Sequence, residues 1–161
     1  MKAIIFDLGG VIVNEMEGWV SKAAAEYYGV PVEVMKQVMD RHEGRRGLAG
    51  WDEDVYWTKI GDDLGIARPV RHLFCERYEE SAPVIQESIE LVKKLRANGY
   101  KLAILSNIIK PHIQLARKRG IVDLFDINVF SCDSEVNSKK PEQKIYKICM
   151  ERLKAKPEEC I

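Results

Sequence analysis

The chain has 161 residues, enough for one domain or for a core domain that carries a small insert. Its 25 basic and 25 acidic residues cancel, so the net charge gives no support for a nucleic acid or a membrane as partner. The sequence lacks a transmembrane-length apolar stretch, a secretory signal pattern, a Cys-x-x-Cys pair and a zinc-type cluster. We therefore expect a reduced, cytoplasmic protein.

The first predicted element is a short buried strand over residues 3–6, Ala-Ile-Ile-Phe. Asp7 follows it directly, and Gly9 and Gly10 come next. Open α/β sheets place their reacting groups at the carboxyl ends of their strands, which is where this carboxylate lies. The two glycines would let the backbone approach a bound phosphate closely. Taken alone, however, Asp-x-Gly-Gly is typical of a simple turn.

Residues 14–82 contain no convincing strand and are predicted to be helical. Apolar residues recur at helical spacing over 19–28, 34–39, 55–64 and 70–78. A glycine-rich, basic loop with Arg45 and Arg46 separates the second helix from the third. We interpret residues 14–82 as a small helical cap domain. Arg45 and Arg46 either contact an anionic part of a substrate when the cap closes or are solvated loop charges.

From residue 83 onward, predicted helices and strands alternate. Strands are expected over 101–105, which ends in Ser106 and Asn107, and over 127–131; helices are expected over 85–95, over 111–118 and from Pro141. Residues 157–161 are typical of a lead-in to a further strand. Strands separated by helices imply an α/β fold with a doubly wound, mostly parallel sheet. Its discontinuous core would comprise 1–13 and 83–161, with the C-terminal part of the core missing.

Three polar side chains follow the three predicted strands. Asp7 ends the first, Ser106 ends the second, and Lys140 comes between the third strand and the next helix. Because the carboxyl ends of parallel strands share one edge of a sheet, we expect these groups to converge there. A carboxylate can attack phosphorus, a hydroxyl can bind phosphate oxygens, and an ammonium can offset the charge that builds up. The trio therefore favours phosphoryl transfer.

The sequences around these residues resemble the haloacid dehalogenase-like hydrolase superfamily. The matching segments are Ile-Ile-Phe-Asp7-Leu-Gly-Gly-Val-Ile, Leu-Ala-Ile-Leu-Ser106-Asn107 and Ser-Lys-Lys140-Pro-Glu-Gln-Lys-Ile-Tyr, with a helical insert in the position of a C1-type cap. The resemblance implies a Rossmann-like core, Asp7 as nucleophile and Mg²⁺ ligand, and the Gly9 carbonyl as a second Mg²⁺ ligand. It also implies that Ser106 and Asn107 bind the phosphate and that Lys140 bridges nucleophile and phosphate.

The chain departs from the pattern of that superfamily in two places. Phosphatases of the superfamily usually carry a second Asp two residues after the nucleophile, where this chain has Gly9. Their acidic fourth motif, which completes the magnesium site, would fall just past Ile161. Gly9 therefore leaves the reaction without its usual general acid and base.

These features lead to one main prediction and two alternatives. The main prediction is a Mg²⁺-dependent phosphatase that acts on a small phosphorylated metabolite through an aspartyl phosphate on Asp7. The first alternative is a non-catalytic protein of the same fold that binds such a metabolite. The second is a 2-haloacid dehalogenase-type hydrolase, which needs no magnesium; Asp-Leu-Gly-Gly differs from the aromatic-Gly-Thr pattern typical of the dehalogenases.

Overall fold

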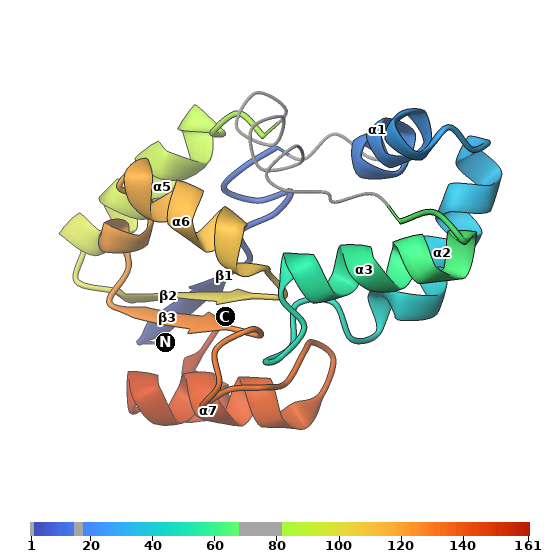
Figure 1. Ribbon diagram of the computed structural model, residues 1–161. Helices are drawn as coiled ribbons and strands as arrows, with labels where there is room; N and C mark the ends of the chain where they lie inside the picture. The colour runs from blue at the N-terminus through green and yellow to red at the C-terminus, as the bar shows by residue number, and fades with distance from the viewer. Residues whose placement is uncertain (1, 15–17, 68–81) are drawn as a thin grey trace.

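A three-stranded parallel sheet forms the centre of the molecule in the computed structural model, which describes residues 2–14, 18–67 and 82–161. Its strands are β1 (Ala3–Phe6), β2 (Lys101–Ser106) and β3 (Ile127–Phe130), in the order β1-β2-β3. Ala3 lies opposite Lys101, and Ala103 lies opposite Ile127. The predicted parallel α/β sheet is therefore confirmed, and its strands all point the same way (Figure 1).

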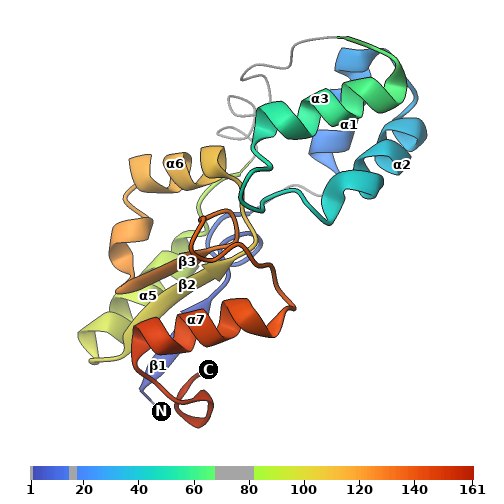
Figure 2. The same cartoon turned by 60° about the horizontal axis from the view of Figure 1, so that its bottom comes forward.

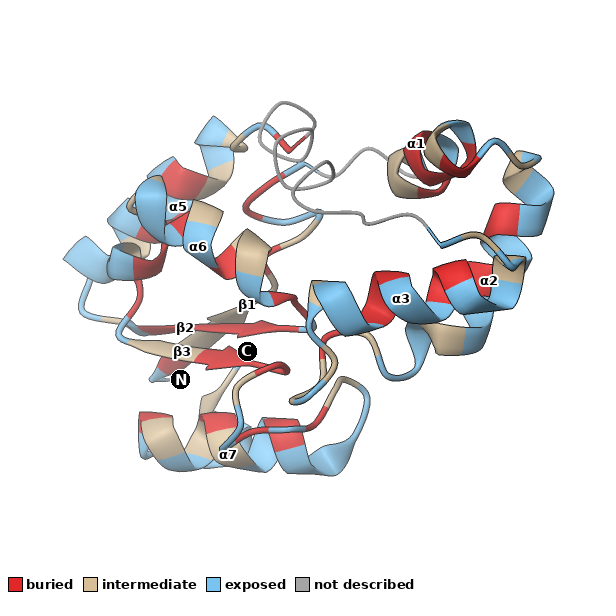
Figure 3. Ribbon diagram, viewed as in Figure 1, coloured by how far each residue is buried: buried red, intermediate tan, exposed pale blue. Residues whose placement is uncertain are grey.

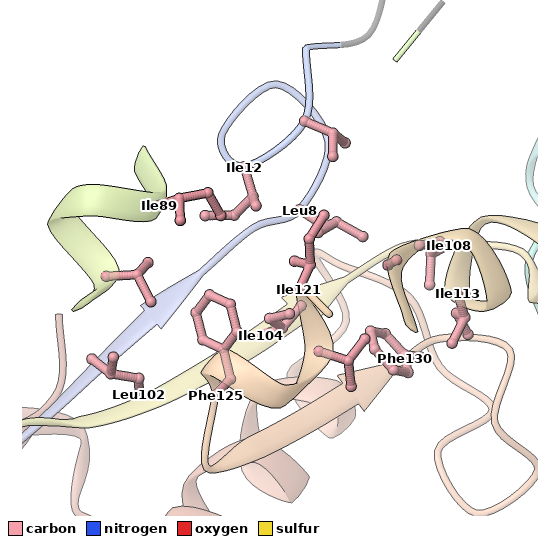
Figure 4. Close-up of a cluster of buried hydrophobic side chains, with 14 of the residues drawn as sticks. Leu8, Ile12, Ile89, Leu102, Ile104, Ile108, Ile113, Ile121, Phe125 and Phe130 are labelled. Atoms are coloured by element: carbon pink, nitrogen blue, oxygen red, sulfur yellow. The ribbon is translucent and has the colours of Figure 1, made fainter. Parts of the chain in front are cut away.

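Helices cover both faces of this sheet. Helices α5 (Gln86–Ala97) and α6 (Lys110–Lys118) lie on one face, and α7 (Gln143–Leu153) lies on the other (Figure 1). The alternation of β2 explains this, because its successive side chains point to opposite faces. Leu102 and Ile104 join the cluster beneath α5 and α6, which Figure 4 shows, whereas Ala103 and Leu105 pack with α7. The sheet is thus doubly wound, as predicted.

The last described residues lie along the free edge of β1. A short 3₁₀ turn, η2 (Pro157–Glu159), leads to Cys160, which pairs with Ala3 in parallel. The Ile161 N–H donates to the Ala3 carbonyl at 3.1 Å, and the Ile5 N–H donates to the Ile161 carbonyl at 2.7 Å. Residues 160–161 therefore run beside β1 in the manner of the further strand that was predicted.

The start of α7 differs from the prediction. The helix begins at Gln143, two residues after Pro141. Glu142 precedes it with an extended backbone, φ −62° and ψ 136°. The Ser138 hydroxyl donates to Glu142 Oε2 at 2.7 Å and closes residues 138–142 into a turn, so the segment that carries Lys140 is a loop.

Three further helices pack on one another and not on the sheet. They are α1 (Trp19–Tyr28), α2 (Val32–Glu43) and α3 (Glu53–Leu64), which confirms three of the four helices predicted for this region. The fourth, over 70–78, lies outside the described residues. We call residues 19–66 the helical unit. Its buried side chains form a cluster of their own, which includes Met35, Tyr56 and Ile60. Figure 3 shows buried positions in red on all three helices.

The helical unit lies beyond the carboxyl ends of the strands, as both Figure 1 and Figure 2 show. Its apolar cluster is separate from those of the core, while its interpretation as an inserted cap domain with boundaries 14 and 82 stays a prediction. None of the helices in the described ranges has the length and apolar character needed to cross a membrane.

Candidate active site

Asp7 and Lys140 meet at the carboxyl edge of the sheet. The Lys140 Nζ atom lies 2.5 Å from Asp7 Oδ2, and the other carboxylate oxygen accepts the Leu8 N–H at 2.8 Å. Both side chains stay open to solvent, 22% exposed for Lys140 and 40% for Asp7. The structure therefore joins the first and third predicted motifs into one charged pair that a ligand can reach.

Asn107 holds the backbone of Lys140 in place. The Lys140 N–H donates to Asn107 Oδ1 at 2.7 Å, and the Asn107 amide donates back to the Lys140 carbonyl at 3.0 Å. Both ends of the side-chain amide are thus engaged by one residue, which gives Asn107 a positioning contact. Its predicted role in substrate binding stays a prediction.

Ser106 ends β2 and is only 3% exposed. It lies opposite Phe130 in the register of β2 and β3, and its carbonyl accepts the Ser131 N–H at 3.1 Å. The residue therefore stands at the predicted edge of the sheet, one position before Asn107. Its predicted contact with a phosphate oxygen stays a prediction.

The loop after Asp7 winds around a single carbonyl oxygen. The Leu8 carbonyl accepts the N–H groups of Ile12 at 2.9 Å and Val13 at 3.0 Å. Gly10 allows this turn because its φ is +71°, a value that suits glycine. Among the described residues, no backbone N–H donates to the Gly9 carbonyl. The predicted role of this oxygen as a Mg²⁺ ligand stays a prediction.

The donor set for a divalent cation is small. Mg²⁺ is commonly held by one or two carboxylates together with substrate phosphate and water. The two predicted ligands, the Asp7 carboxylate and the Gly9 carbonyl, lie close together in sequence and supply the single carboxylate that this pattern requires at least. Within the described ranges, no three His, Cys, Asp or Glu side chains gather into a metal site.

A pocket of about 830 Å³ opens over the Gly9–Gly10 loop. Helices α1 and α2 of the helical unit supply most of its described walls, with Trp19 and Met39 as apolar lining. Its charged lining residues are Lys22, Lys36, Asp40 and Glu43. The pocket is therefore lined by a mixture of glycine, apolar and charged residues.

A second pocket, of about 170 Å³, lies between the helical unit and the core. Its lining includes Arg46, Gly47, Asn107, His112 and Lys139. Glu43 lines both pockets, so the two adjoin at the end of α2. Arg45 is absent from the lining of both; it is exposed, with its guanidinium 5.4 Å from the centre of the Trp51 ring. The structure thus separates the two arginines that were predicted together.

Arg46 is held inside the helical unit and is not a solvated loop charge. Its side chain is 14% exposed, its Nε donates to Glu53 at 3.5 Å, and its guanidinium lies 4.6 Å from the Tyr56 ring centre. Burial lowers the pKa of Arg46, but the nearby Glu53, Tyr56 and Glu43 outweigh it, so the pKa is raised overall. Arg46 therefore keeps its positive charge beside the smaller pocket.

His112 lines the same pocket as a neutral group. Burial, and then the positive charge of Arg46, lower its pKa from 6.5 to about 3. The residue lies in the first turn of α6, where the positive end of the helix dipole also disfavours an imidazolium. Sequence reasoning gave His112 no role, because nothing near it in sequence shows that a cap arginine lies beside it.

The chain belongs to the haloacid dehalogenase-like hydrolase family, since the family model matches residues 1–161. A phosphorylated carbohydrates phosphatase from Thermotoga maritima is 28% identical, over all of this chain and 74% of its own length. The crystal structure of a haloacid dehalogenase-family phosphatase from Thermococcus onnurineus is also 28% identical, with a TM-score of 0.67 over 99% of this chain and 75% of its own.

The fold also matches a structure of a family enzyme from Bacteroides thetaiotaomicron, at a TM-score of 0.78. That enzyme is 19% identical, and the match covers 99% of this chain and 82% of the other. The resemblance seen in the three sequence motifs therefore identified the family correctly, and hydrolysis is the class of reaction that the family defines.

Proposed function

We propose that this protein is a Mg²⁺-dependent phosphatase of a small phosphorylated metabolite, with Asp7 as the nucleophile. The observation that carries the proposal is the 2.5 Å contact between Lys140 and Asp7, at the strand edge beside the glycine loop. A carboxylate so placed can attack phosphorus, while the ammonium offsets the charge that develops on the phosphoryl oxygens. The phosphatase names of two relatives at 28% identity support it.

The reaction would run in two steps on Asp7. An Asp7 oxygen attacks phosphorus as the ester P–O bond breaks, and the alcohol leaves with a proton taken from water. Water then attacks the phosphorus of the aspartyl phosphate, inorganic phosphate leaves, and the Asp7 carboxylate is restored. Asn107 keeps Lys140 in place through both steps. When bound, Mg²⁺ would supply further charge neutralisation, held by Asp7 and the Gly9 carbonyl.

Gly9 sets the preference for the leaving group in this proposal. It supplies no carboxylic acid to protonate a departing alkoxide, and general acid catalysis is worth roughly 10²–10⁴ in rate. Esters of acidic alcohols and acyl phosphates, whose leaving groups need no protonation, would therefore turn over fastest. The helical unit would act as the cap, and the charged pocket beneath α1 and α2 would bind the leaving group. We propose a phosphorylated sugar as substrate class, in keeping with the name of the Thermotoga relative, with a turnover slower than that of acyl phosphates because a sugar alkoxide needs protonation.

The test is phosphate release from a panel of sugar phosphates and acetyl phosphate, with Mg²⁺ and with a chelator. Activity should require Mg²⁺ and should disappear in Asp7→Asn. Asp126→Asn is the matched control, because Asp126 lies at the opposite end of the sheet, where it accepts the Leu102 N–H at 2.8 Å. Full activity in Asp7→Asn would refute the proposal.

One specific observation favours a second candidate, a phosphometabolite-binding protein without turnover. Gly9 stands where the general acid would be, and among the described residues Asp7 and Gly9 make a minimal metal site. This candidate expects calorimetric binding of phosphate or sugar phosphate with no release from any ester in the panel. Halide release from a 2-haloacid without metal would support dehalogenase chemistry instead of either.

A further inference from the structure

Three hydrogen bonds join the helical unit to one short segment of the core. The Lys139 ammonium donates to the Glu43 carbonyl at 2.7 Å, and the Ala49 N–H donates to Asn137 Oδ1 at 3.2 Å. The third runs from the Ser131 hydroxyl to the Gly47 carbonyl at 2.6 Å. On the side of the helical unit, all three use backbone atoms of residues 43–49. These bonds therefore fix the course of that loop through its backbone.

Ser131 makes the buried contact of the three. It is fully buried, and its hydroxyl accepts the Ile108 N–H at 3.0 Å while it donates to Gly47. The Ile108 carbonyl is also near, at 3.3 Å, but a hydroxyl has one proton and the Gly47 carbonyl is the closer acceptor. One side chain thus ties the loop of the helical unit to the residue that follows Asn107.

The backbone of Gly47 comes close enough to the core to require glycine. A Cβ atom placed there would lie 3.1 Å from the Ile108 carbonyl oxygen and 3.4 Å from Ser131 Oγ, and its φ is +75°. Loop and core are therefore in contact at Gly47, next to Arg46, whose side chain lines the smaller pocket.

The core segment that receives these bonds is also the segment that carries Lys140. Lys139 binds the end of α2, and the adjacent Lys140 binds Asp7. Ile108, which donates to Ser131, directly follows Asn107, which holds Lys140. Docking of the loop on residues 131–139 and placement of the lysine against the nucleophile thus depend on the same short stretch of chain.

We propose that Ser131 is a positioning residue that docks the loop 43–49 on the core and so sets how tightly the substrate's leaving group is held. Only the kinetic part of this proposal rests on the phosphatase function proposed above. Ser131 touches neither Asp7 nor Lys140 in the described contacts, so its effect reaches the reaction through the position of the helical unit. Removal of its hydroxyl should loosen binding of the leaving group more than it slows the chemical step.

The first experiment is amide hydrogen exchange in Ser131→Ala. The exchange rate of the Ala49 N–H should rise about tenfold, because the buried bond that holds the loop beside it is lost. Ser138→Ala is the matched control: Ser138 is also fully buried in the same segment, but its hydroxyl donates to Glu142 and to no residue of the helical unit in the described structure. Unchanged exchange at Ala49, or an equal rise in both variants, would overturn the proposal.

The second experiment measures kinetics with two substrates. Ser131→Ala should raise KM for a sugar phosphate about tenfold and leave kcat nearly unchanged, while acetyl phosphate, whose leaving group is too small to reach the helical unit, keeps both constants. Equal losses with both substrates would show a merely structural role and would overturn the proposal.

Failure of the proposed function can be told apart from failure of the docking role of Ser131. If wild-type protein hydrolyses no ester, the proposed function fails, and hydrogen exchange at Ala49 still decides whether Ser131 docks the loop. If Ser131→Ala does not fold, Lys139→Met tests the same docking from the surface and should raise exchange in the loop. A loop that exchanges at the wild-type rate in Lys139→Met would then contradict the proposal.

Discussion

Substitution of Gly47 by alanine tests how closely the helical unit meets the core. Gly47 and Gly50 lie in one loop and both have positive φ, +75° and +82°. A Cβ atom at Gly50 would have no neighbour within 4 Å, whereas at Gly47 it would lie 3.1 Å from the Ile108 carbonyl oxygen. Gly50→Ala is therefore a matched control that carries the backbone cost without the crowding.

The expected magnitudes differ accordingly. Alanine in the left-handed region costs about 1 kcal/mol, which should be the whole effect of Gly50→Ala on the free energy of unfolding. In Gly47→Ala the backbone oxygen of Ile108 cannot swing away as a flexible side chain would. The 2.6 Å bond between Ser131 and the Gly47 carbonyl must lengthen or break, which adds roughly 1–2 kcal/mol.

Urea unfolding of the two variants and wild type, followed by circular dichroism, provides the measurement. We expect Gly47→Ala to lose about 2–3 kcal/mol and Gly50→Ala about 1 kcal/mol, with unchanged m-values. Equal losses in the two variants would refute the reasoning, because the contact between loop and core would then contribute nothing beyond the backbone conformation.

Lys140→Met should reduce kcat about 10²–10³-fold, yet it should change the free energy of unfolding by less than about 1 kcal/mol because its ion pair is partly exposed. The Lys139→Met control should keep the kcat of wild type, and a fall in its kcat equal to that of Lys140→Met would contradict the assignment. Because the pKa of His112 is lowered to about 3, the unfolded state binds a proton near pH 6.5 that the folded state does not. Stability should therefore fall by up to about 1.4 kcal/mol per unit as pH drops from 6.5 toward 3. His112→Gln should remove that slope in urea titrations at several pH values, and a slope that persists would exclude His112 as its source. Gly9 is not among the residues with positive φ, so Gly9→Asp avoids that backbone cost and should raise kcat up to ~10²-fold for sugar phosphates but not for acetyl phosphate. An equal gain with both would show that no general acid was restored.

The sheet and its carboxyl edge could be predicted because the sequence marks where the first two strands end. Apolar runs stop at Asp7 and at Ser106, and helical patterns separate the runs, which leaves a parallel arrangement as the natural solution. Parallel strands share one edge, so the approach of Lys140 to Asp7 across most of the chain was within reach of sequence reasoning.

Contacts that depend on loop geometry could not be predicted in this way. The bond between Ser131 and Gly47 joins residues 84 positions apart, and nothing in either local pattern points to the other. The burial of Arg46 against Tyr56 depends on how α2 and α3 pack, so its basic loop sequence pointed only to a substrate contact or to solvent. The reciprocal bonds of Asn107 with Lys140 likewise depend on the turn before α7. The sequence pattern placed the start of α7 at Pro141, two residues before the observed start at Gln143.

The separation of the apolar clusters has a thermodynamic consequence. The helical unit and the core each bury their own hydrophobic side chains, and the three hydrogen bonds that join them are polar. Parting the two at these bonds would leave the described apolar clusters buried, so the contribution of those clusters to the heat-capacity change of opening would be small. The enthalpy change of parting the helical unit from the core would then depend little on temperature, whereas the enthalpy change of unfolding depends on it strongly. Opening would thus respond mainly to groups that compete for hydrogen bonds.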